Sequence, residues 1–442
     1  MARPQPIDIP KVLTTLLPPA ELDRMAAEVD LVRRQRKFDV HAFFWTLVLG
    51  FGTGHHRTLA ALRRAYQVAT GQSVAPSAFY DRFTPALVRF LKATVLWALS
   101  RVAQPVRPLR GKLAQFTDLV VTDSTVLRLH DLLESTFPAC RTNHTRAALK
   151  MRTVLSVLGT GPRSVRITSE RVHDGPVFQV GPWVKGRLLL FDLGYFRYQL
   201  FCCIDRNKGF FIVRLKSNAN PLIVGVNQTW RGRSVELLGQ RIQDVRKRLQ
   251  RQSLDVQVEV TFKRRVYGGV RHKGIERFRL VGVRDAHTGE YHLYLTNIPP
   301  ERLDATDIAQ TYAARWLVEL FFRELKSHYR GDQMPSAKRA VVEALLYAVL
   351  WTVLVSRTLL ETARRRLGDK GRRLPTERWA IVFAAVALDV LRLMVGPAPA
   401  GSIERLLLHE GIDPNVKRLL LLERVEAGTQ FRDRYAVGGD CA

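Results

Sequence analysis

The stretch from Tyr312 to Lys326, YAARWLVELFFRELK, places a carboxylate among cationic and phenolic side chains. On one α-helix, at about 100° per residue, four of them fall within about 60° of one another and a fifth lies beside them. These are Tyr312, Arg315, Glu319 and Lys326, with Arg323 alongside. The apolar residues fill the opposite arc, which predicts a core-facing surface. Such a stripe could bind a phosphate backbone, with a solvated face of Glu319–arginine pairs as the alternative.

Two aspartates follow apolar runs that predict strands. Asp123 ends the run in VVTDST and Asp192 ends the run in LLLFDLGYF. A carboxylate beside a buried strand costs several kcal/mol unless a cation, a donor or a metal accompanies it. Either residue alone could be a turn or cap residue. Asp118 and Asp131 flank Asp123, but Asp118 starts the run and Asp131 lies beyond it, so Asp123 is preferred.

Together with Glu319, these aspartates form a set of three carboxylates suited to two Mg²⁺ or Mn²⁺ ions. Two such ions can activate a water or a 3′-hydroxyl and stabilise the leaving oxygen of a phosphodiester. The cationic neighbours of Glu319 would then orient the phosphates. This interpretation predicts Asp123, Asp192 and Glu319 as metal ligands and catalytic residues, and Tyr312, Arg315, Arg323 and Lys326 as phosphate-binding residues.

The charge of the chain indicates its partner. Lys and Arg number 69 and Asp and Glu number 40 in 442 residues, which gives a net charge of +29. Nucleic acid is the expected partner, because so large an excess of positive charge suits phosphate neutralisation, and a membrane surface is the weaker alternative. The N-terminal residues do not resemble a signal peptide, which favours the cytoplasm. The apolar run Ala344–Val355 is too short for a membrane span and predicts a buried helix.

Three regions differ in their patterning. Residues 1–112 have helical apolar spacing and basic residues, which predicts a helical region that could bind DNA ends, with a helical bundle that has a solvated basic face as the equal alternative. Residues 113–330 contain short β-branched runs separated by turns, with a strand-rich insertion at about 220–300. From Arg231 to Arg284 this block carries 15 Lys and Arg against 5 Asp and Glu. Residues 331–442 return to helices, for which DNA binding or dimerisation is the hypothesis. The expected fold class is α/β.

The chain resembles the DDE transposases of bacterial insertion sequences. Tyr312, Arg315, Glu319 and Lys326 match the pattern Tyr, two residues, Arg, three residues, Glu, six residues, Lys that marks one subgroup. Asp123 in TDST and Asp192 in FDLGY are similar to the first and second catalytic aspartates. The resemblance is good over about residues 113–330 and is only general in the flanking helices.

The resemblance implies a mixed sheet of the RNase H type, interrupted by the β-rich insertion and flanked by the helical regions. It also implies Mg²⁺-dependent cleavage at the element ends, the terminal inverted repeats, followed by strand transfer into target DNA by a homodimer. Family members can flip a base onto an aromatic residue of the insertion, for which Tyr291 and Tyr294 are the available residues. Core packing is the more favoured role for both.

Two other classes of function remain open. One is a DNA-binding protein derived from a transposase that has lost catalysis, and the intact carboxylates argue against it. The other is a metal-dependent nuclease without strand transfer, which would use the same residues. The DNA flanking the gene would distinguish them, since inverted repeats favour transposition.

Overall fold

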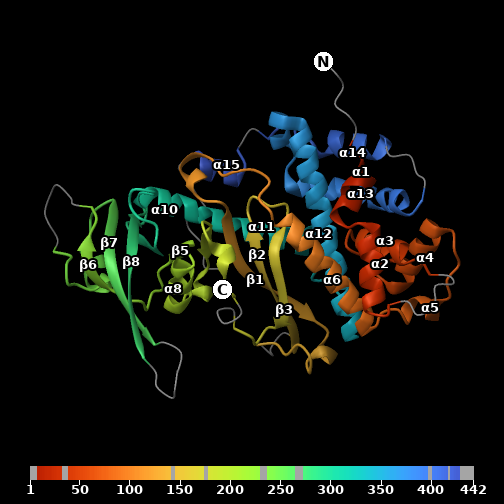
Figure 1. Ribbon diagram of the computed structural model, residues 1–442, viewed down its shortest axis with the longest axis horizontal. Helices are drawn as coiled ribbons and strands as arrows, with labels where there is room; N and C mark the ends of the chain where they lie inside the picture. The colour runs from red at the N-terminus through yellow and green to blue at the C-terminus, as the bar shows by residue number, and fades with distance from the viewer. Residues whose placement is uncertain are drawn as a thin grey trace.

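The structure is a computed structural model, and it describes most of the chain (Figure 1). The described residues are 7–31, 38–140, 145–173, 178–228, 236–263, 272–396, 401–416 and 419–428. The predicted insertion therefore lies partly outside the described residues. Within these ranges, strands occupy the middle of the chain and helices dominate both ends, as the sequence patterns predict.

The described strands form one mixed sheet in the order β3-β2-β1-β4-β5-β9-β8-β7-β6. Strand β1 pairs antiparallel with β2 and parallel with β4, and β4 pairs parallel with β5. This is the RNase H-like arrangement that the resemblance implies. The first five strands are β1 (Leu119–Leu129), β2 (Ala147–Ser156), β3 (Pro162–Ser169), β4 (Leu188–Phe191) and β5 (Phe210–Arg214). They are aliphatic or β-branched runs, and helix α8 (Tyr198–Arg206) connects β4 to β5.

The strand-rich insertion extends this same sheet. Its strands are β6 (Leu222–Val226), β7 (Ser253–Lys263), β8 (Lys273–Arg284) and β9 (Tyr291–Thr296), with the short helix α9 (Ile242–Arg246) between β6 and β7. Strand β9 joins the two halves because it pairs antiparallel with both β5 and β8. The insertion is therefore tied to strands β1–β5 by backbone hydrogen bonds.

Apart from α15, the helices of the two chain ends pack together on one side of the molecule, at the right in Figure 1. Helix α12 (Arg339–Leu367) contacts α6 (Pro85–Val102) and α1 (Ile9–Leu16), and Trp351 Nε1 donates to Thr94 Oγ1 over 2.9 Å. The remaining helices are α2 (Pro19–Glu28), α3 (Val40–Thr46), α4 (Leu59–Thr70), α5 (Pro76–Tyr80), α13 (Thr376–Val395), α14 (Gly401–Gly411) and α15 (Leu421–Glu426). Helix α12 is long and apolar enough to cross a membrane, but most of its apolar window is buried inside this fold, as predicted for a core helix.

The Tyr312–Lys326 stretch is not one regular α-helix, so the single helix predicted for it is wrong. Helix α10 (Ala305–Tyr312) leads into a 3₁₀ turn, then α11 (Trp316–Arg323), then a π-helical turn over Glu324–His328. Tertiary contacts at both ends accompany the breaks. The Tyr312 hydroxyl donates a hydrogen bond to the carbonyl oxygen of Phe191 at the end of β4. Arg357 Nε donates one to the buried carboxylate of Glu324. A 3₁₀ turn tightens and a π turn widens the helix, which changes the spacing of the predicted stripe.

Candidate active site

Asp123 and Asp192 are brought together by the parallel pairing of β1 and β4. Thr122 is opposite Phe191, so Asp192 directly follows β4 at the level of Asp123. Asp123 lies within β1 and not at its end, because β1 runs on to Leu129. Asp192 ends its strand as predicted, and its carboxylate caps the following 3₁₀ turn by accepting from the Gly194 N–H.

Helix α11 brings the third carboxylate to the same place. The helix contacts β1, and Arg315 at its start reaches both Glu319 and Asp123. Arg315 Nη2 lies 2.6 Å from Glu319 Oε1, and Arg315 Nη1 lies 3.7 Å from Asp123 Oδ2. Arg315 therefore links two of the three predicted carboxylates, and the third, Asp192, follows β4 at the level of Asp123.

Burial and nearby negative charge disfavour the charged forms of Asp123 and Glu319. Burial, followed by the nearby charge of Asp192, raises the pKa of Asp123 to about 7. The pKa of Glu319 is also raised, chiefly by burial, although Arg315 opposes this shift. Like charges in a partly buried site require a compensating cation.

The donor set suits a hard divalent cation in its chemistry. Three carboxylates are ligands that Mg²⁺ and Mn²⁺ prefer, and their electrostatic conflict is one that a cation relieves. Among the described residues, however, no three carboxylates, histidines or cysteines are already grouped as metal ligands. Arg315 provides positive charge between two of the carboxylates in this structure. The residues fit a metal only if this arginine moves.

The other predicted phosphate-binding residues lie in different surroundings. Tyr312 is buried, and its hydroxyl donates to the Phe191 carbonyl oxygen over 2.9 Å, so in this structure it supports the strand end before Asp192. Lys326 is half-buried, and burial lowers its pKa. Arg323 is exposed and lies 3.3 Å from Glu377 of α13. Only Arg315 directly contacts the carboxylates.

The two tyrosines considered for base stacking are core residues. Tyr291 is buried and its hydroxyl donates to the Arg251 carbonyl oxygen. Tyr294 is also buried, with its ring centroid 5.2 Å from that of Tyr312. Both rings are buried in this structure, and base stacking on either of them stays a prediction.

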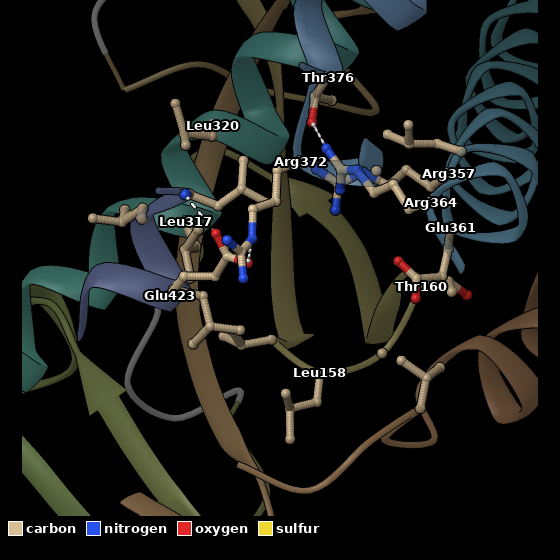
Figure 2. A pocket seen from close by; sticks show the side chains of 18 of the residues that line it. Leu158, Thr160, Leu317, Leu320, Arg357, Glu361, Arg364, Arg372, Thr376 and Glu423 are labelled. Carbon is tan, nitrogen blue, oxygen red and sulfur yellow. Dashed lines mark hydrogen bonds and ion pairs between the residues drawn. The ribbon is translucent and has the colours of Figure 1, made fainter. Parts of the chain in front are cut away.

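A large pocket behind α11 was not foreseen from the sequence. It has a volume of about 820 Å³ and is lined by Leu317 and Leu320 of α11. Figure 2 shows these leucines facing Arg372, Arg364 and Glu423, which come from the C-terminal helical region. Arg372 Nε donates to Glu423 Oε1 over 3.0 Å. The pocket joins segments far apart in the chain, so no local motif could predict it.

The raised pKa of Asp123 leads to a prediction on stability. An unfolded Asp titrates at about 3.9, and folding raises this pKa to about 7. The folded state therefore prefers the protonated carboxyl, and the free energy of unfolding decreases as the pH rises between these values. We expect Asp123→Asn without divalent metal to be more stable than wild type at pH 8 by about 1–3 kcal/mol, with little difference near pH 4.

Urea unfolding at several pH values in the presence of a chelator would measure this difference. Asp389→Asn, a change at a half-exposed position on α13, is the matched control and should show no such trend. A stability difference for Asp123→Asn that does not change with pH would contradict the prediction.

The chain is similar to several known proteins. Residues 114–355 match the model of the transposase DDE domain family. The chain is 21% identical over 412 residues to the transposase for insertion sequence element IS231F of Bacillus thuringiensis subsp. israelensis, covering 84% of this chain and 83% of that protein. It is 20% identical over 373 residues to the transposase for IS1151 of Clostridium perfringens, covering 78% of each. A solved structure of the piggyBac transposase synaptic complex with hairpin DNA has a TM-score of 0.45 and 11% identity, covering 93% of this chain and 86% of that one.

Proposed function

Since this chain belongs to the transposase DDE domain family and is a DNA transposase of an insertion sequence, we propose that Asp123, Asp192 and Glu319 are its catalytic carboxylates. The observation that carries this proposal is that β1 and the end of β4 place Asp123 and Asp192 side by side, while Arg315 at the start of α11 links Asp123 to Glu319. The match to the subgroup motif of Tyr312, Arg315, Glu319 and Lys326 adds support from the sequence.

Enzymes of this family use divalent metal ions, and we propose two Mg²⁺ or Mn²⁺ ions held by these three residues. When bound, the ions supply the Lewis acidity that activates a water or a 3′-hydroxyl and stabilises the leaving oxygen. The chain itself orients the DNA. Arg315 has a planar fork suited to a phosphate, and Lys326 and Arg323 follow it on the same segment. Tyr312 fixes the end of β4 and thereby positions Asp192.

The protein binds DNA, and we propose which parts contact it. The terminal inverted repeats and target DNA would lie across the carboxylates and the basic insertion. We propose residues 1–112 as the region that reads the element ends, and residues 331–442 as a further DNA-binding or dimerisation region. A homodimer would hold the two ends of the element. The site of action would be the bacterial cytoplasm, at the nucleoid.

The direct test is cleavage and strand transfer on a labelled fragment that carries the DNA flanking this gene. With Mg²⁺, the protein should nick at the element boundary and join the new 3′ ends to a target duplex, and a chelator should abolish both products. Nicking without joining would favour a nuclease without strand transfer. DNA binding without cleavage in either Mg²⁺ or Mn²⁺ would favour a DNA-binding protein that has lost catalysis.

A second prediction concerns the basic insertion. Lys263 and Lys273 are exposed and directly opposite each other at the far end of the β7–β8 pair. Like charges in this position repel, so a phosphate partner would relieve the repulsion. We expect Lys263→Gln with Lys273→Gln to weaken DNA binding and to reduce the slope of log affinity against log salt by up to about 1.8, which is about 0.9 for each phosphate that is no longer neutralised.

Affinity measured between low and moderate salt would test this. The matched control replaces two exposed lysines near the other half of the sheet, Lys185 and Lys208, with glutamine. An unchanged salt slope in the Lys263 and Lys273 variant would remove the β7–β8 end from the proposed DNA surface.

A further inference from the structure

One guanidinium links two carboxylates that come from different elements. Arg315 Nη2 lies 2.6 Å from Glu319 Oε1 on α11, and its Nη1 lies 3.7 Å from Asp123 Oδ2 on β1. The Arg315 side chain is only 13% exposed and the Asp123 side chain 21% exposed. Water therefore screens this cluster poorly, and the arginine supplies the local positive charge that holds the two carboxylates together.

The two carboxylates that Arg315 contacts are also two of the three proposed metal ligands. A metal ion requires ligand oxygens at about 2.0–2.2 Å, whereas a guanidinium keeps them at hydrogen-bond distance along its planar fork. Two cations would also repel each other in so small a volume. Within the described part of the chain, no set of three ligands is grouped ready for a metal. The arrangement around Arg315 is thus an alternative to the metal-bound arrangement.

A phosphate offers Arg315 another partner. Guanidinium groups bind phosphate oxygens in the same two-pronged manner as carboxylates. Arg315 lies in the 3₁₀ turn between α10 and α11, and leaving Glu319 requires a change of its side-chain rotamer alone. A DNA phosphate at the site would satisfy the arginine and free the carboxylates.

We infer that Arg315 is an internal counter-cation that occupies the carboxylates in the free protein, and that a DNA phosphate must draw it away before divalent metal binds well. This inference rests on the proposed function and adds a mode of regulation to the same site. Metal binding and DNA binding then strengthen each other, because each requires the same movement. The free protein would bind divalent metal weakly. The site would therefore gain its metal only after DNA is in place.

The test measures Mn²⁺ affinity directly, from the electron paramagnetic resonance signal of free Mn²⁺, with no reliance on turnover. Arg315→Met removes the charge and keeps a similar length. We expect it to bind Mn²⁺ at least about tenfold more tightly than wild type in the absence of DNA. Wild type should gain a similar factor when a duplex that already ends at the cleavage site is added, and Arg315→Met should gain little.

Two further variants make the result specific. Arg339→Met is the matched control, because Arg339 and Glu343 on α12 form an Arg–Glu pair with the same four-residue spacing. It should bind Mn²⁺ as wild type does. Adding Glu319→Gln to Arg315→Met should remove the gained affinity, which would place the gain at these carboxylates.

Equal Mn²⁺ affinities of wild type and Arg315→Met would overturn the inference, as would an equal gain in Arg339→Met or a wild-type affinity unaffected by DNA. If Arg315→Met is poorly folded without metal, Arg315→Gln, which also removes the charge, provides the second variant, and a larger rise in melting temperature with Mn²⁺ than in wild type is expected. If Arg315→Met shows no gain in Mn²⁺ affinity but wild type still cleaves DNA with Mg²⁺, the proposed function stands. If Arg315→Met shows the gain but wild type does not cleave DNA, only the proposed function is overturned.

Discussion

Glu319→Gln is expected to bind element-end DNA as tightly as wild type and to cleave it at least about 10³-fold more slowly, corresponding to about 4 kcal/mol of lost transition-state stabilisation. Glutamine keeps the size and a hydrogen-bonding oxygen but loses the negative charge that would bind a divalent ion. Glu319 contacts Arg315 through one carboxylate oxygen in the free protein, so the amide oxygen can still accept that bond and the fold should be preserved.

Single-turnover cleavage of a labelled element-end duplex would measure the rate, and a binding assay without divalent metal would measure the affinity. Glu301→Gln is the matched control, because Glu301 is an exposed residue before α10. It should cleave as fast as wild type. A cleavage rate for Glu319→Gln within a few-fold of wild type would remove Glu319 from the catalytic set.

The second large effect is expected on stability, at a buried ion pair in the insertion. Arg279 is 2% exposed and binds both oxygens of Asp255 at 2.6 and 2.9 Å. Its Nη1 also donates to the carbonyl oxygens of Ile298 and Leu303, just before α10. Arg279→Met leaves the Asp255 charge buried without its partner, and we expect it to lower the free energy of unfolding by about 3–5 kcal/mol.

The neighbouring cross-strand pair provides an internal control. Arg277 is 71% exposed and lies 3.6 Å from Glu259 on the same two strands. Solvent screens such a pair, so Arg277→Met should cost less than about 1 kcal/mol. Urea unfolding of both variants would measure the difference. Similar decreases in the free energy of unfolding for Arg279→Met and Arg277→Met would show that burial does not determine how strongly these ion pairs stabilise the protein.

Sequence patterns predicted the features that depend on residues close together along the chain. The β-branched runs predicted the strands, and the apolar runs before Asp123 and Asp192 indicated buried strands with a carboxylate close by. They misplaced the end of β1, because residues 124–129 continue the strand with alternating burial and without an apolar run. Backbone pairing between distant strands could not be read at all, so the continuity of the sheet through β9 was not predicted.

The sequence named the residues of the candidate site, but it did not predict which of them contact one another. Regular helical spacing placed Tyr312, Arg315, Glu319 and Lys326 on one stripe, and the structure keeps only Arg315 and Glu319 in direct contact. Tyr312 is bonded to the end of β4, 121 residues earlier in the chain, and no local pattern records that bond. Arg315 was predicted as a phosphate ligand, whereas its contact with Asp123 depends on the packing of α11 against β1.

The burial of α12 beneath the N-terminal helices also has a consequence for protein synthesis. Helix α6 has its packing partner 257 residues further along the chain, since Thr94 is bonded to Trp351. The ribosome must therefore release α12 before the first helices can complete their core. A transcript that ends early, or a reading frame that shifts before α12, would yield a chain with exposed apolar helices that aggregates or is degraded. Translation of nearly the whole gene is thus a condition for any folded transposase.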